Sequence, residues 1–379
     1  MYDDVNMDIG ELIMETTLKE NLDQLREVAK ERTVRTQDVG YNLETLVGKI
    51  EKGVIRLNPE YQRHHRWDDE TSSRLIESLI LNIPIPTVYI SQDVDVDDEI
   101  DDGIARYSVI DGQQRLTAIY EFMKNKYALT GLKVLELLNG LMYRDLPPFL
   151  IRRLEERGIS CLWIDSVIDP QVKYDIFERL NTGSVQLESQ ELRNAVYRGP
   201  FNDMIKKLAE YKKYRLLLQI GDKNVENNNK VKKMMDTEMV LRYFALCDNG
   251  IEKMKKSFKD FLSEQMDRFN KLDGKELEKM EKQFYAVVDE IYDKLGENAF
   301  AKYKNERKIQ SKFNAAVYDA VMVAVSDKIK DGSLRIEEQN IINFNNLFGE
   351  TGFRKNIDGS TGDKSKIKGR IKMTKEVFS

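Results

Sequence analysis

The residues best suited to chemistry stand side by side in the segment Asp111-Gly112-Gln113-Gln114-Arg115. The residues before it predict a strand, and those after it predict a helix. Backbone N–H groups at the start of a helix lack partners within the helix and favour an anion. Arg115 can donate two hydrogen bonds to a phosphate, and Asp111 can hold a metal ion, a water molecule or a ribose hydroxyl. The segment predicts a phosphate site; the alternative is an ordinary junction in which Asp111 caps the helix and Arg115 is solvated.

Two further segments are rich in side chains that contact phosphates or bases, and each has a structural alternative. The first extends from Tyr61-Gln62-Arg63 to Arg66-Trp67, whose aromatic residues could instead pack in the core or at its edge. The second joins Asn181-Thr182-Gly183 to Glu191 and Arg193-Asn194 on the next expected helix. Its first three residues also suit the end of a helix, and Glu191 could cap its own helix or pair with Arg193.

Apolar spacing and capping residues predict the elements that must position these segments. Asn42 is expected to cap a helix over 43–52 that Gly53 ends, and Asp68 or Asp69 to cap a helix that ends at Leu81. Residues 128–146 are expected to be loop-like. The other elements expected before residue 200 are helices over 11–31, 113–126, 147–157, 172–180 and 188–197, and strands over 54–57, 88–90, 105–110 and 160–164.

Beyond residue 200 the pattern becomes wholly helical, with outer faces rich in Lys and Glu. The predicted fold class is therefore α+β, with a small mixed sheet in an N-terminal domain and an all-α domain after it. We expect four parts: a helical arm over 1–40, the mixed domain over 41–200, the helical domain over 201–350 and a basic tail over 351–379. The helical segments are 202–218, 231–247, 251–270, 275–295, 309–328 and 336–347.

Charge and composition exclude several classes of protein. The chain of 379 residues has a net charge of −5, so binding to nucleic acid would need a local basic patch. The tail over 353–379 supplies one, with 8 Lys or Arg against 3 acids, and it predicts either a solvated face or a contact with DNA. The acidic segment 93–102 predicts a solvated hairpin loop rather than a calcium loop. No apolar run approaches the roughly 18 residues of a membrane span.

Cysteine and histidine usage narrows the chemistry further. Cys161 and Cys247 lie on apolar segments and are expected to be buried thiols in the cytoplasm, and the acidic N-terminus lacks the pattern of a signal peptide. The two histidines, His64 and His65, are adjacent. A His-rich zinc site, an HNH nuclease site and a Ser-His-Asp triad are each hard to build from them. The groups that remain available for catalysis are carboxylates, arginine, amides and a hard metal ion.

Taken in order, the three polar segments resemble the N-terminal domain family of GmrSD-type modification-dependent restriction enzymes, a ParB/sulfiredoxin-like family. A weaker match at 236–242 extends the likeness into the helical region. The Asp-Gly-Gln-Gln-Arg match is complete, and the resemblance covers roughly residues 40–200. The matching segments are Pro59-Glu60-Tyr61-Gln62-Arg63, Arg66-Trp67, Leu75-Ile76-Glu77-Ser78-Leu79, Pro84-Ile85-Pro86, 110–117, Phe177-Glu178-Arg179-Leu180-Asn181-Thr182-Gly183, Leu187 and Glu191-Leu192-Arg193-Asn194-Ala195.

The resemblance implies a nucleotide pocket and assigns its residues by position. The phosphate and metal end would take Asp111, Gln113, Gln114 and Arg115 around Gly112, with Mg²⁺ on Asp111. The catalytic group would be Asp111, Gln114 and Arg115. The opposing wall would be formed by Tyr61-Gln62-Arg63, and Asn181 would close the pocket.

Many relatives append a His-dependent HNH nuclease, whereas this chain has no histidine after residue 65. The first hypothesis is therefore a nucleoside-triphosphate-binding and hydrolysing protein of anti-phage or restriction-type defence. It would act as a sensor or regulatory subunit on DNA, with a separate nuclease subunit or as a homo-oligomer. The second is a metal-dependent DNA nuclease that uses Asp111, Glu60 and Glu191 as ligands. The third is a non-enzymatic DNA- or protein-binding module.

Overall fold

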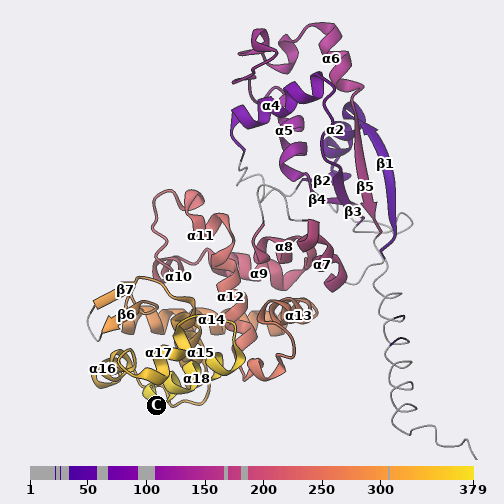
Figure 1. Cartoon of the computed structure of the whole chain (residues 1–379). Helices are drawn as coiled ribbons and strands as arrows, with labels where there is room; N and C mark the ends of the chain where they lie inside the picture. The colour runs from indigo at the N-terminus through magenta and orange to yellow at the C-terminus, as the bar shows by residue number, and fades with distance from the viewer. Residues whose placement is uncertain are drawn as a thin grey trace, which may run out of the picture. The chain divides into compact units, whose positions relative to one another are not determined.

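The computed structural model describes residues 22, 26, 34–57, 67–92, 107–165, 170–180, 187–305 and 308–379. The chain forms two compact units, Met1–Val172 and Lys173–Ser379. The first unit holds a five-stranded sheet with helices packed beside it, and the second consists mainly of helices (Figure 1). This arrangement confirms the predicted α+β fold class.

The sheet of the first unit is mixed and has the strand order β1-β5-β3-β4-β2. β5 pairs antiparallel with β1 and parallel with β3, whereas β4 pairs antiparallel with β3 and parallel with β2. The last residue of β4, Asp111, pairs with Tyr89 of β3. The strands are β1 (Thr36–Asn42), β2 (Ile55–Arg56), β3 (Val88–Gln92), β4 (Tyr107–Asp111) and β5 (Gly158–Ile164).

Two helices of this unit begin at the caps that the sequence predicts. Asn42 Oδ1 accepts a hydrogen bond from the Thr45 N–H at 2.9 Å and starts α2. Asp68 Oδ1 accepts one from the Thr71 N–H at 2.8 Å and starts α4. Each bond satisfies a backbone donor that the first turn leaves open. The elements are α2 (Leu43–Glu51), α4 (Asp69–Ile80), α5 (Gln113–Met123), η1 (Glu136–Leu138), η2 (Tyr143–Asp145) and α6 (Pro148–Glu155).

One apolar core joins the helices of the first unit to its sheet. Side chains of α2, α4 and α5 meet those of β3 and β5 in this core. Cys161 is buried there, as predicted, and burial raises the pKa of its thiol to about 11. The core includes Leu43, Leu46, Ile76, Leu79, Val88, Ile90, Leu116, Ile119, Phe122, Ile159 and Cys161.

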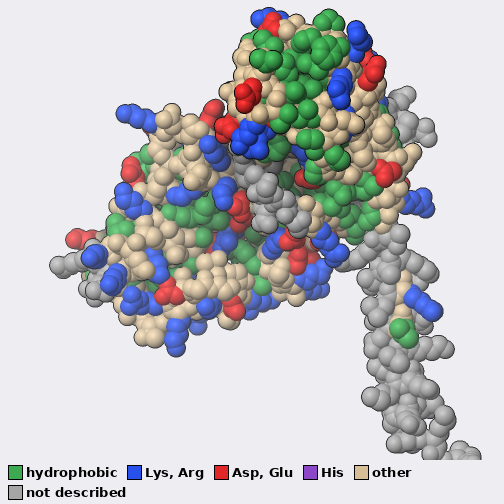
Figure 2. Space-filling view, turned by 45° about the horizontal axis from the view of Figure 1, so that its top comes forward, with side chains coloured by type: hydrophobic (Ala, Val, Ile, Leu, Met, Phe, Trp, Pro, Cys, Tyr) green, Lys and Arg blue, Asp and Glu red, His purple; other side chains and the backbone are tan. Residues whose placement is uncertain are grey.

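The segment between α5 and α6 is fixed by a buried carboxylate of α4. Glu77 Oε1 accepts hydrogen bonds from the N–H groups of Val134 and Leu135, each at 2.8 Å. Burial alone would raise the pKa of Glu77, but these N–H donors hold it below its usual value. The segment nevertheless exposes Val134 (68%) and Leu137 (96%), and Figure 2 shows hydrophobic side chains gathered on one face of the first unit.

The second unit is built around an apolar helix, α15, whose residues from Ala316 to Ser326 are all buried. A helix that is buried all round forms the centre of a core, and α12, α14 and α18 contact it.

α7 crosses the boundary between the units. The elements are α7 (Pro170–Leu180), α8 (Ser189–Val196), α9 (Pro200–Ala209), α10 (Lys212–Leu217), η3 (Val225–Asn227), α11 (Asn229–Lys232), α12 (Met235–Leu246), η4 (Gly250–Lys253), α13 (Phe258–Asn270), α14 (Gly274–Leu295), β6 (Lys302–Asn305), β7 (Lys308–Ser311), α15 (Ala315–Lys330), α16 (Glu338–Leu347), α17 (Thr351–Ile357) and α18 (Lys364–Val377).

Inside this core one carboxylate holds two guanidinium groups. Asp319 accepts a hydrogen bond from Arg242 Nε at 3.0 Å and another from Arg370 at 2.6 Å. Arg370 also donates to the Thr361 carbonyl at 2.8 Å. All three charged side chains are at most 6% exposed. The segment 351–379, expected as a basic tail, is thus packed into the second unit as α17 and α18.

Two local predictions are wrong. A helix was expected over 309–328, but Lys308–Ser311 is strand β7 and α15 starts only at Ala315. Asn314 sets that start, because its side chain accepts hydrogen bonds from the N–H groups of Ala316 at 2.9 Å and Val317 at 3.1 Å. Strand β1 was not expected, because it is a mostly exposed edge strand with little apolar alternation.

The predicted arm over 1–40 lies largely outside the described residues, as does the acidic segment 93–102. The predicted domain boundary at residue 200 stays a prediction, and the compact units divide at Val172. Among the described residues, no helix combines the length and the apolarity that crossing a membrane requires.

Candidate functional site

The site begins at the sharp turn from β4 into α5. Gly112 occupies the N-cap position of α5 with a φ of +93°, a backbone conformation that other residues rarely adopt. A Cβ at this position would lie only 3.0 Å from Val88 Cγ2 and 3.2 Å from Arg115 Nη2. Both the backbone conformation and the close packing therefore require glycine, and the turn aims the start of α5 past the end of β4.

The start of α5 has no side-chain cap. The N-cap residue makes no side-chain hydrogen bond, and the first bond within the helix runs from the Leu116 N–H to the Gly112 carbonyl at 2.9 Å. The N–H groups of Gln113, Gln114 and Arg115 precede that bond. They carry the positive end of the helix dipole, which favours an anion at this position.

At the same place, one atom of each of two buried side-chain amides has no hydrogen-bond partner among the described residues. Gln113 is 7% exposed and Gln114 is 8% exposed. Within the described part of the chain, Gln113 Nε2 and Gln114 Oε1 have no partner. A buried polar atom without a partner costs about 1–3 kcal/mol. One open donor and one open acceptor next to an uncapped helix start are features of a ligand site.

Arg115 is already engaged within the turn. Its guanidinium donates to Asp111 Oδ2 at 2.9 Å, to the Thr87 carbonyl at 3.4 Å and to the Pro86 carbonyl. Burial lowers the pKa of Arg115, and the nearby Asp111 partly offsets this effect. Arg115 therefore ties α5 to the start of β3. Its predicted contact with phosphate stays a prediction.

Asp111 is the accessible acid of the site, because its side chain is 43% exposed whereas that of Arg115 is 11% exposed. No group of three or more His, Cys, Asp or Glu side chains able to hold a metal is found among the described residues. A single carboxylate does not form a protein cage for Mg²⁺. It does fit the usual arrangement in which Mg²⁺ is held by one or two carboxylates and by the phosphates of a substrate.

The other residues assigned to the pocket lie outside the described part of the chain. They are Tyr61, Gln62, Arg63 and Asn181, together with Glu60 from the nuclease hypothesis. Their proposed roles stay predictions.

The segment after Asn181 has a structural role that the sequence only partly indicated. Arg193 of α8 is 1% exposed and donates to Glu238 Oε2 at 3.0 Å, to Gln190 Oε1 at 3.1 Å and to Ser263 Oγ at 3.3 Å. It thus fastens α8 to α12 and α13. The predicted capping role of Glu191 is confirmed, since its Oε2 accepts the Glu188 N–H at 2.7 Å.

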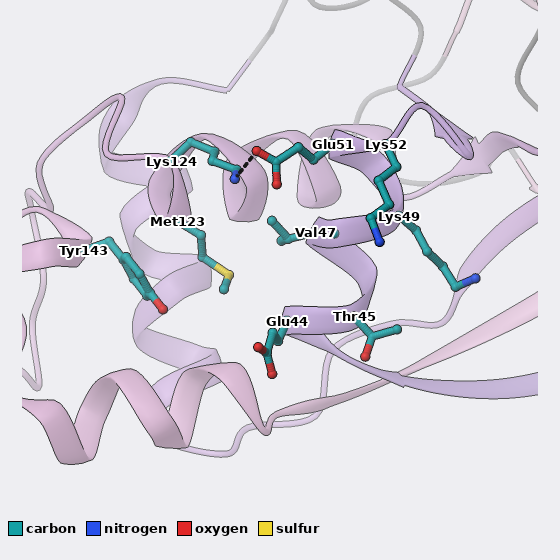
Figure 3. Close-up of a pocket in the computed structure, with 10 residues that line it drawn as sticks. Glu44, Thr45, Val47, Lys49, Glu51, Lys52, Met123, Lys124 and Tyr143 are labelled. Atoms are coloured by element: carbon teal, nitrogen blue, oxygen red, sulfur yellow. Dashed lines mark ion pairs between the residues drawn. The ribbon is translucent and has the colours of Figure 1, made fainter. Parts of the chain in front are cut away.

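A hollow of about 740 Å³ lies elsewhere in the first unit, between α2, the end of α5 and η2. Its floor contains Val47 and Met123, and its rim carries charges of both signs (Figure 3). Lys124 and Glu51 point toward each other and form an ion pair at 2.6 Å. None of the described residues assigned to the predicted site lines this hollow, and none of its described lining residues has an unpartnered buried atom, so it is a weaker candidate.

Comparison with known proteins gives one match. Residues 43–198 match the model of the GmrSD restriction endonuclease N-terminal domain, so this segment is similar to that domain. A domain of this family indicates a protein of restriction-type phage defence. Comparisons with curated proteins and with solved structures gave no significant match. The matched segment starts at α2 and ends just after α8, so it contains both the β4–α5 turn and the helix that carries Arg193.

Proposed function

We propose that this protein binds and hydrolyses a nucleoside triphosphate as a sensor or regulatory subunit of a restriction-type defence system. The observation that carries the proposal is the pair of unpartnered buried amides, Gln113 and Gln114, at the uncapped start of α5 beside the exposed Asp111. A phosphate oxygen supplies the acceptor that Gln113 Nε2 lacks. A water molecule or a protonated ligand group supplies the donor that Gln114 Oε1 lacks.

The roles of the residues in hydrolysis follow from this arrangement. The N–H groups at the start of α5 stabilise negative charge on the phosphates. Gln114 orients a water molecule toward the terminal phosphorus. As the new P–O bond forms, the bond to the bridging oxygen breaks, the nucleoside diphosphate leaves, and the proton of the water passes to a phosphate oxygen. Mg²⁺, when bound with the nucleotide at Asp111, neutralises phosphate charge. Arg115 keeps Asp111 and the turn in position through its contacts with β3.

The proposed sensor role rests on where the two histidines lie in the chain. Both histidines precede residue 66, so the chain offers no later histidine for an HNH site. We therefore propose that DNA cleavage belongs to a separate nuclease subunit, which this protein would regulate. The direct nuclease hypothesis has no set of metal ligands among the described residues to support it, and its third ligand, Glu60, lies outside them.

Calorimetric titration of the full chain with ATP, GTP, CTP and UTP in the presence of Mg²⁺ tests the proposal. We expect micromolar binding of one nucleotide, lost in Gln114→Ala and retained in Gln339→Ala, an exposed glutamine of α16. Phosphate release should follow the same pattern. Absence of binding by all four nucleotides, or full binding by Gln114→Ala, would overturn the proposal. Metal-dependent nicking of DNA that is lost in Asp111→Ala would favour the nuclease hypothesis instead.

A further inference from the structure

The β6–β7 hairpin of the second unit carries an unusual set of charges. Its two strands and the residue after them contain four lysines and no acid among the described residues: Lys302, Lys304, Lys308 and Lys312. The last three are exposed and form no ion pair with any described residue. Figure 1 shows the two strands at the edge of the second unit, near α16 and α17.

Several exposed lysines elsewhere in this unit form ion pairs. Examples are the pairs of Lys207 with Glu281 at 2.5 Å, Lys271 with Asp267 at 2.6 Å and Lys330 with Asp248 at 2.7 Å. Paired lysines keep a protein soluble and need no partner. Three unpaired lysines on one short hairpin repel each other, and an anionic partner would relieve this repulsion.

The hairpin is anchored to the body of the second unit rather than left loose. The Tyr303 ring packs against Phe348 with centroids 5.1 Å apart, and Lys302 forms an ion pair with Asp358. Arg354 Nη2 of α17 donates to the Lys304 carbonyl at 2.9 Å. The same helix presents Lys355, which is exposed and has no ion pair with a described residue. The hydrogen bond from Arg354 thus places α17 beside β6, and both elements carry exposed lysines.

We propose that this surface, formed by Lys304, Lys308, Lys312 and Lys355, binds the phosphate backbone of duplex DNA. A two-stranded ribbon fits the major groove of B-DNA, about 12 Å wide, and lysines on it reach phosphates without reading the sequence. The choice of DNA as the polyanion rests on the proposed function in a restriction-type system. The surface belongs to the second unit, whereas the β4–α5 turn belongs to the first.

The test uses the full chain and a fluorescein-labelled DNA duplex of random sequence, followed by anisotropy over a series of salt concentrations. The variant is K304Q/K308Q/K312Q, and the matched control is K275Q/K279Q/K282Q on α14, which makes the same change in net charge. We expect the hairpin variant to bind at least about tenfold more weakly and to lower the salt slope by about 3, and the control to bind almost as the wild type does.

Three results would overturn the proposal: equal weakening in both variants, no weakening in the hairpin variant, or no binding of duplex DNA by the wild type. Tight binding to phosphatidylserine vesicles without binding to DNA would also overturn it. Nucleotide titration of the same variants separates this proposal from the first. If the hairpin variant loses DNA but keeps nucleotide, and Gln114→Ala shows the reverse, the two sites are independent.

Discussion

The Arg193 guanidinium of α8 lies 3.0 Å from the Glu238 carboxylate of α12. Arg193 belongs to the segment that matches the restriction-enzyme family, and Glu238 lies 40 residues beyond its last residue. The ion pair connects the last helix of the matched segment to α12, and the likeness expected at 236–242 stays a prediction. In this chain, the last helix of the matched segment thus packs against a helix that lies outside that segment.

Arg193→Met is expected to destabilise the second unit by about 3 kcal/mol, because it removes a buried charge and leaves Gln190, Ser263 and Glu238 short of a donor. Both tryptophans, Trp67 and Trp163, lie in the first unit. Urea unfolding followed by far-UV circular dichroism should therefore shift, while the tryptophan fluorescence transition should not. Lys207→Gln, which breaks an exposed pair, should change neither. A common shift of both signals in Arg193→Met would show instead that the units unfold together.

Gly112→Ala is expected to destabilise the first unit by about 2 kcal/mol, because a Cβ there combines a left-handed backbone with a contact of 3.0 Å to Val88. Unfolding followed by tryptophan fluorescence measures the loss. Gly48→Ala is the control, since Gly48 lies inside α2 and a Cβ there meets nothing within 4 Å. That change should stabilise the unit by about 0.5–1 kcal/mol. Equal effects of the two changes would contradict the geometry of the turn.

Glu77→Gln is expected to loosen the segment between α5 and α6, because a neutral amide oxygen is a weaker acceptor for the Val134 and Leu135 N–H groups than the carboxylate Oε1 that accepts both. Amide hydrogen exchange at Val134 and Leu135 should become at least about tenfold faster, which corresponds to about 1.4 kcal/mol of local stability. Because the folded pKa of Glu77 is lowered, its contribution should be present near neutral pH and should disappear as acid protonates it. Unchanged exchange would show that other bonds hold the segment.

Asp236 is expected to make the stability of the folded protein depend on pH with a sign opposite to that of Glu77. Burial raises the pKa of Asp236 to about 6 from a usual value of 3.8. The folded state therefore binds more protons than the unfolded state between these values, and stability should fall as pH rises through this window. Asp236→Asn should remove the slope and stabilise the protein above pH 6 by at most about 3 kcal/mol. Circular dichroism unfolding over this pH range checks it, and a wild-type stability that rises with pH there would argue against a buried neutral Asp236.

The sequence correctly predicted the elements whose ends are set by contacts between residues close together in the chain. Asn42 and Asp68 begin helices because a side chain three residues before a backbone donor is enough to satisfy it. The same reasoning found the β4–α5 turn, because the sequence itself shows a glycine between a strand and a helix. In this part of the chain the sequence alone was sufficient.

The features that were missed depend on contacts between distant residues. Strand β1 is held by its pairing with β5, whose residues lie more than 100 positions later, and its own composition gives little sign of a strand. The β6–β7 hairpin is likewise anchored by Phe348 and Arg354. The partners of Arg193 are also distant, so its role in packing could not be separated from a role in the site. In a sequence, a charged residue that binds a ligand and one that forms a buried ion pair look the same.

The position of α18 has a consequence for the order in which the chain folds during synthesis. Arg370 binds Asp319 in the core of the second unit, and α18 contacts α15. A ribosome must therefore translate this helix before the nascent second unit can close its core. The core of the first unit is made of residues up to Cys161 and needs none of them. The turn at Asp111 can thus fold while the helices that follow are still being translated. The second unit folds later, and its apolar side chains stay exposed until α18 has been translated.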